Sequence, residues 1–147
     1  MSDQEWHGRF AAECFNRAWE LLDLPERSQE QEADLLSSAF AQRFHWSQVG
    51  DETNHAVADW QVSRALAATR NGPLAVHFAE MALARAEAFA GPDYLVPSCF
   101  EGLARAHAAV GDAPQRDVWL AKARAALEGI KDAEDRDLIA SQIAELG

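Results

Sequence analysis

Apolar residues recur along this chain every three or four positions, and that spacing leaves few choices of fold. Residues so spaced share one face of a helix, whereas a half-buried strand needs strict alternation. No sustained alternation occurs, and β-branched residues are sparse. The stripes are Phe10, Cys14, Ala18 and Leu21; Ala33, Leu36, Phe40 and Phe44; Phe78, Ala82, Ala86 and Phe89; Phe100, Leu103, His107 and Val110; and Leu120, Ala123, Leu127 and Ile130. The pattern predicts an all-α chain in which every helix needs a partner surface.

Start and stop signals divide the chain into about seven helices. Ser2 with Glu5 and Ser28 with Gln31 have the spacing of capping boxes. Prolines 73, 97 and 114 fall in expected first turns, and glycines 50, 72, 91, 111 and 129 fall where helices should end. The expected helices are 3–23, 28–48, 52–70, 73–90, 97–110, 113–129 and 133–146. Because the connections are short, consecutive helices should pack antiparallel.

The length of 147 residues and a hydrophobic content of 48% are those of a single domain, 1–147. Cys14 and Cys99 lie among apolar helical residues, which favours free thiols in a reducing compartment. The first ten residues lack the basic and apolar regions of a signal peptide, and no apolar run approaches the roughly 18 residues of a membrane span. We therefore expect a cytoplasmic protein without a membrane partner.

The formal net charge of −11 argues against nucleic acid as a partner, because Lys and Arg supply most non-specific affinity for phosphates. A cationic or neutral partner is easier to accommodate.

A weak internal repeat indicates how the helices are grouped. A constant offset of 41 positions relates Arg64 to Arg105, Pro73 to Pro114, Phe78 to Trp119 and Ala82 to Ala123. An offset of 47 extends the register to Arg17. This favours three hairpins, 3–48, 52–90 and 97–129, followed by a closing helix, 133–146, stacked because one hairpin cannot bury its own apolar face. Chance similarity among alanine-rich helices is the alternative.

The segment LARAHAAVGDAPQRDVWLAKARAAL (residues 103–127) resembles a degenerate tetratricopeptide repeat, with small residues facing the partner helix and Gly111 at the turn. It departs from the family in its longer period and in having His107 where a tyrosine is usual. The chain also resembles a group of uncharacterised bacterial helical-hairpin proteins through FNRAWELLD (15–23), QRFHW (42–46) and WQVSR (60–64). The first resemblance implies a short right-handed superhelix whose concave groove, lined by the first helix of each hairpin, binds peptides or proteins; the second implies no activity.

One end of the expected bundle collects aromatic and histidine residues. If the first two helices turn back near residues 24–27, Trp6 lies level with Trp46, and His7, His45, His55 and Trp60 reach the same end. The candidate pocket residues there are Arg43, His45, Trp46, His55, Asp59, Trp60 and Arg64. These residues either line a pocket or fill the ends of the hairpins, where burial of each aromatic ring is favourable.

Arginines 17, 64 and 105 recur at equivalent places on the first helix of each hairpin. They could form a ladder that grips carboxylates in the groove. The alternative is internal ion pairing with Asp and Glu of neighbouring helices.

Complete catalytic or metal-binding sets are missing from the sequence. Glu52 and His55 have the spacing of one half of a di-iron site, but the second ExxH pair is absent. Cys14 and Cys99 lack neighbouring basic residues that would favour a thiolate, and no phosphate-binding glycine motif occurs. We expect no cofactor and no metal.

The sequence thus predicts a non-catalytic module that binds a protein or peptide, or a second copy of itself as a homodimer. The alternative is a small-molecule-binding protein or an enzyme whose pocket lies at the Trp- and His-rich end.

Overall fold

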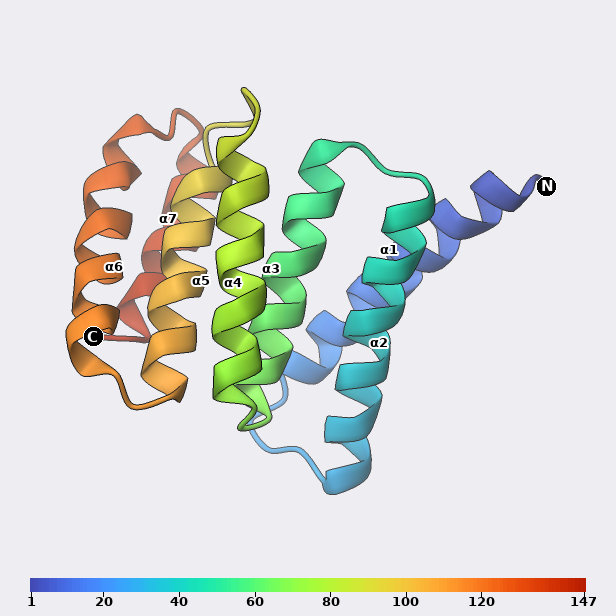
Figure 1. Cartoon of the computed structure of the whole chain (residues 1–147), viewed down its shortest axis with the longest axis horizontal. Helices are drawn as coiled ribbons and strands as arrows, with labels where there is room; N and C mark the ends of the chain where they lie inside the picture. The colour runs from blue at the N-terminus through green and yellow to red at the C-terminus, as the bar shows by residue number, and fades with distance from the viewer.

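The computed structural model describes residues 1–147 and contains seven α-helices and no strand (Figure 1). The helices are α1 (Asp3–Leu22), α2 (Gln29–Gln48), α3 (Glu52–Ala68), α4 (Gly72–Glu87), α5 (Leu95–Ala109), α6 (Ala113–Ala126) and α7 (Ala133–Ala144), with a 3-10 turn, η1, at Leu127–Gly129. The predicted all-α class is therefore confirmed. None of the helices combines the length and the apolar character that a membrane span requires.

The helix ends follow the expected signals with local differences. Ser28 and Gln31 make both bonds of a capping box, whereas the Glu5 side chain meets the hydroxyl of Ser2 instead of its backbone amide. Helix α5 begins two residues earlier than expected, at Leu95. Helix α6 ends earlier than expected, because the chain tightens into η1.

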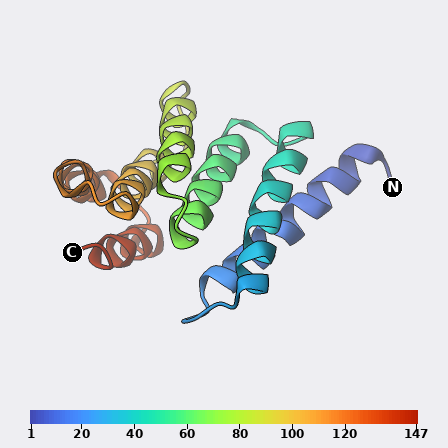
Figure 2. The same cartoon turned by 60° about the horizontal axis from the view of Figure 1, so that its bottom comes forward.

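Consecutive helices pack as pairs, α1 with α2, α3 with α4 and α5 with α6, and run in opposite directions (Figure 1). The first helices of these pairs also contact one another, α1 with α3 and α3 with α5, and α7 joins this row by packing against α5. Figure 2 shows α1 and α7 at the two ends of the row. The expected closing helix therefore extends the row of first helices. The right-handed superhelical stacking stays a prediction.

Small side chains dominate the core between the pairs. Its largest cluster joins the first five helices and includes Ala18, Ala39, Val62, Ala75 and Leu103. Residues related by the offset of 41 occupy matching places: Ala82 and Ala123 are fully buried, while Pro73 and Pro114 lie in the first turns of α4 and α6. Alanine lets helix axes approach closely, which leaves little room for cavities inside the stack.

Candidate binding groove

Two adjoining pockets lie along the row of α1, α3, α5 and α7. The first, of about 480 Å³, is the aromatic pocket. It is lined chiefly by Phe15 and Trp19 of α1, Val57 and Trp60 of α3, Tyr94 and Cys99 at the start of α5, and Leu138 and Ile139 of α7. The second, of about 610 Å³, is the alanine pocket, lined by Leu22, Leu24, Ala67, Ala68, Ala108 and Ala109 among others. Because both pockets include Asp23, Arg64 and Glu145, they form one continuous groove.

Two tryptophans form one side of the aromatic pocket. The rings of Trp19 and Trp60 lie 5.6 Å apart between centroids, at an interplanar angle of 44°. Arg64 follows Trp60 by one helical turn, and its Cζ lies 5.2 Å from the Trp19 ring and 5.9 Å from the Trp60 ring. A guanidinium over indole faces is an attractive cation–π arrangement. The aromatic pocket therefore already stabilises one cation of the chain itself.

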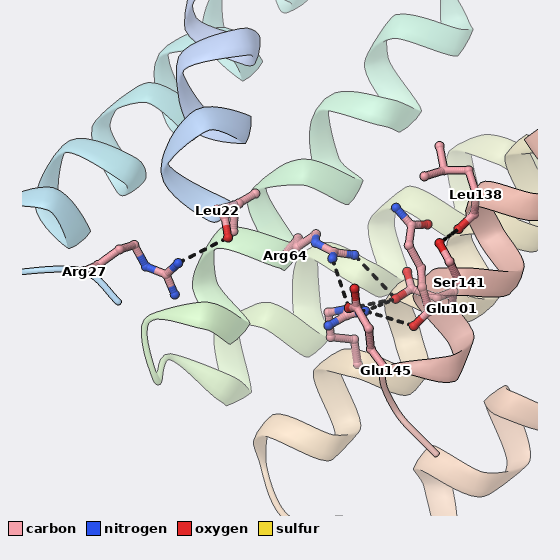
Figure 3. A network of polar contacts seen from close by, with 9 residues as sticks. Leu22, Arg27, Arg64, Glu101, Leu138, Ser141 and Glu145 are labelled. Atoms are coloured by element: carbon pink, nitrogen blue, oxygen red, sulfur yellow. Dashed lines mark hydrogen bonds and ion pairs between the residues drawn. The ribbon is translucent and has the colours of Figure 1, made fainter. Parts of the chain in front are cut away.

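A charged network, drawn in Figure 3, lies where the two pockets meet. Glu101 of α5 is fully buried; its Oε1 accepts a hydrogen bond of 2.8 Å from Arg105 and lies 3.5 Å from Arg64. Glu145, at the end of α7, lies 2.8 Å from Arg105 and 3.5 Å from Arg64. Burial lowers the pKa of Arg64, and the nearby charge of Arg105 adds to this, while the charges of Glu101, Glu145 and Asp23 oppose it. The network holds α3, α5 and α7 together at the middle of the groove.

Two other carboxylates of the aromatic pocket form no ion pair. The side chains of Asp23, which follows α1, and Asp135, in the first turn of α7, make no ion pair and no hydrogen bond within the chain. Burial raises the pKa of the Tyr94 hydroxyl, and the charges of Asp135 and Asp51 raise it further. The aromatic pocket therefore contains one half-buried carboxylate, Asp135, that forms no ion pair, and a second, exposed one, Asp23, whose charge acts on Arg64.

The thiol in the aromatic pocket is unsuited to nucleophilic chemistry. Burial, with the charges of Glu87, Asp59 and Glu101, raises the pKa of Cys99 to about 12. Only a thiolate attacks electrophiles efficiently, so Cys99 is inert at neutral pH. Burial also raises the pKa of Cys14, which lies outside the groove. The arrangement offers surfaces for binding and no activated nucleophile among its cysteines.

The structure divides the predicted site residues among several places. Arg43 and Asp59 belong to an ion cluster among α2, α3 and α4, in which buried Asp59 binds Arg43 on one oxygen and Arg85 on the other, the latter at 2.6 Å. A hollow of about 190 Å³ adjoins this cluster and also borders His55. The Nε2 of His55 lies 2.9 Å from the carbonyl oxygen of Trp46.

His45 lies elsewhere again, between α1 and α2. Its Nδ1 is 2.8 Å from Nδ1 of His7, beside the rings of Phe10 and Phe44. This contact agrees with the predicted antiparallel alignment of the first two helices, in which Trp6 lies level with Trp46. Trp60, in contrast, packs on Trp19 in the groove. The structure therefore does not unite Trp60 with His45 and Trp46 in one pocket.

The three arginines of the expected ladder have different surroundings. Arg64 and Arg105 both bind Glu101 and Glu145, which is the internal ion pairing considered as the alternative. Arg17 lies on the surface of α1 and pairs with Glu20 at 3.3 Å. Arg64 and Arg105 are thus engaged with carboxylates of the chain itself, whereas Arg27, which lines the alanine pocket, donates to the backbone carbonyls of Leu21, Leu22 and Leu24.

Several groove residues were not among the sequence candidates, notably Trp19, Asp23, Tyr94, Asp135 and Leu138. The sequence did contain a signal for Trp19, because Phe15 and Trp19 are one turn apart and form an aromatic stripe beside the core stripe of α1. No comparable signal marks Asp135 or Leu138, whose place depends on how α7 packs.

Comparison with known proteins adds no relative: no family model matches the chain, and neither a curated protein nor a solved structure matches it.

Proposed function

We propose that this chain is a non-catalytic, tetratricopeptide-like module that binds a peptide segment of another protein in the groove of α1, α3, α5 and α7. The observation that carries the proposal is the continuity of the aromatic and alanine pockets along the first helices of the hairpins. A groove with apolar walls and a few polar groups is the usual form of a peptide or ligand site. The two free cysteines agree with a reducing, cytoplasmic setting.

Site-specific photo-crosslinking tests this function. Leu138 is the test position, because its side chain is exposed and lines the aromatic pocket on α7. Val118 on α6 is a matched control, since it is similarly exposed and lies outside the groove. We expect benzoylphenylalanine at position 138 to crosslink a defined protein that the same group at position 118 does not. Identical products at the two positions, or none at 138, would argue against a groove-binding module.

A small-molecule site is the second candidate, because about 480 Å³ lies within the range of ligand pockets. A metabolite screen that follows the fluorescence of Trp19 and Trp60 tests it. A saturable response that is lost in Trp60→Phe, while crosslinking at position 138 yields no protein, would favour this candidate over peptide binding.

A further inference from the structure

We infer that the aromatic pocket accepts a basic side chain, lysine or arginine, carried by an otherwise apolar segment of a protein partner; this inference rests on the groove being the binding face. Three features of the groove support this inference: the charges of the residues that line the aromatic pocket, the aromatic rings beside them, and the ion pairs that already engage Arg64 and Arg105.

Charge complementarity is the first reason. The pocket contains three carboxylates, Asp23, Asp135 and Glu145, and one guanidinium, Arg64. Glu145 is bound by Arg64 and Arg105, and the exposed Asp23 also acts on Arg64, which leaves half-buried Asp135 as the carboxylate that no cation of the chain pairs with. Asp23 follows the end of α1 and Asp135 lies in the first turn of α7, and both line the pocket. A cation in the pocket would be attracted by both.

The rings of the pocket supply the second reason. Phe15, Trp19, Trp60 and Tyr94 border the same space. Aromatic faces attract cations, and they also cover the methylene stem of a lysine or arginine. Arg64 already lies over Trp19 and Trp60 at 5.2 and 5.9 Å, which shows that the indoles accept a guanidinium. A second cation would need the part of the lining to which Arg64 is not bound, which includes Tyr94 and Asp135.

Other occupants fit less well. An acidic segment would face Asp23 and Asp135, while Arg64 and Arg105 are held by Glu101 and Glu145. Arg27, which lines the alanine pocket and not the aromatic one, donates to the backbone carbonyls of Leu21, Leu22 and Leu24. A second copy of this chain carries a net charge of −11 itself, so its approach to an acidic groove is opposed by long-range repulsion. The matching partner is therefore a different protein with a basic segment.

Nuclear magnetic resonance on the ¹⁵N-labelled chain tests the inference. The probes are three peptides, acetyl-Ala-Leu-X-Leu-Ala-amide, in which X is lysine, norleucine or glutamate. Norleucine keeps the stem of lysine but lacks its charge. The indole N–H signals of Trp19 and Trp60 report on the pocket, and those of Trp6 and Trp46, which do not line it, serve as internal controls.

We expect the lysine peptide to shift the Trp19 and Trp60 signals with a Kd roughly tenfold below that of the norleucine peptide, as one charged contact provides. Asp135→Asn combined with Asp23→Asn should largely remove this preference. Asp137→Asn, which changes an exposed carboxylate of the same helix outside the pocket, should retain it. The preference should also fall in 1 M salt, where the Debye length is about 3 Å.

Equal or tighter binding of the norleucine peptide would overturn the basic subsite, as would strongest binding of the glutamate peptide or shifts confined to Trp6 and Trp46. The absence of any shift at millimolar peptide would overturn it as well. The groove itself is judged separately by crosslinking at position 138, so a partner captured there together with equal lysine and norleucine affinities would leave peptide binding intact and remove only the basic subsite. Concentration-dependent dimerisation in sedimentation that Leu138→Lys abolishes would point instead to a second copy.

Discussion

The indole of Trp60 on α3 lies directly against the backbone of Gly102 on α5. A Cβ at Gly102 would come within 2.9 Å of Trp60 Cδ1 and 3.2 Å of its Nε1. Gly102 is buried in the middle of α5, where glycine costs about 1 kcal/mol relative to alanine. This contact accounts for the glycine, because only a residue without a side chain leaves room for the indole that forms part of the aromatic pocket.

Gly102→Ala should therefore destabilise the chain despite improving helix propensity. Overpacking costs about 1–3 kcal/mol, of which roughly 1 kcal/mol is offset by the better helix former, so we expect a net loss of about 1 kcal/mol. Urea unfolding measures it. The indole N–H resonance of Trp60 should also move, since the ring has to shift.

Gly8→Ala is the matched control in α1, where an added Cβ meets nothing within 4 Å. We expect this variant to gain about 0.5–1 kcal/mol. If both variants were more stable than the parent chain, the close approach of Trp60 to Gly102 would be wrong.

Removing the charge of Glu101 should be the most damaging conservative change in the groove. Glu101→Gln leaves Arg64 and Arg105 facing each other in a largely buried place without their inner carboxylate. Loss of one partner from a buried ion pair costs about 3–5 kcal/mol. The free energy of unfolding from denaturant titration is the measurement.

Glu145→Gln provides the comparison, because Glu145 binds the same two arginines but its side chain is 54% exposed. Exposed pairs contribute about 0–1 kcal/mol. Similar losses in the two variants would show that burial does not govern this network.

Alkaline pH should destabilise the chain through Cys99. Its pKa rises from about 9 when the thiol is solvated to about 12 in the folded chain, so the folded chain holds the proton more tightly. The contribution of the protonated thiol to the free energy of unfolding is therefore fully present below pH 9. It falls as the pH rises from 9 towards 12, by up to about 1.4 kcal/mol per pH unit. Unfolding titrations at several alkaline pH values measure the slope.

Cys99→Ala should flatten that slope, whereas Cys14→Ala should change it less, because Cys14 is only half-buried. In mass spectrometry after brief alkylation at neutral pH, Cys99 should remain unmodified until the chain unfolds. Rapid alkylation of Cys99 in the folded chain would contradict the burial of this thiol.

Asp59→Asn should weaken the contact among α2, α3 and α4. The change removes the charge that binds Arg43 and Arg85, but the arginine side chains are 31% and 44% exposed and can turn to water. We expect a loss of about 2 kcal/mol from hydrogen bonds to a charged group, less than for Glu101→Gln. Thermal unfolding measures it, with Asp137→Asn expected to stay within about 0.5 kcal/mol of the parent chain. An unchanged melting temperature in Asp59→Asn would mean that the cluster does not hold these helices together.

The sequence placed Trp60, Arg64 and Arg105 among the candidates, and the structure places the first two in the aromatic pocket and the third beside it in the charged network. Its grouping of Trp60 with Asp59 in one pocket was wrong for a geometric reason. Consecutive helical residues project about 100° apart, so Asp59 faces α2 and α4 while Trp60 faces α1 and α5. The pattern of a single helix identifies its faces but does not say which neighbour each face meets.

What the sequence alone determined is local: seven helices, the Ser28 cap, the short connections and the acidic charge. These depend on hydrogen bonds and periodicity within a few residues. The tertiary structure decided that α7 packs beside α5, that Asp135 and Leu138 line one pocket with Trp19 and Trp60, and that Glu145 pairs with Arg64 and Arg105. Those relations join segments far apart in the chain, and they arise from the packing of whole helices on one another.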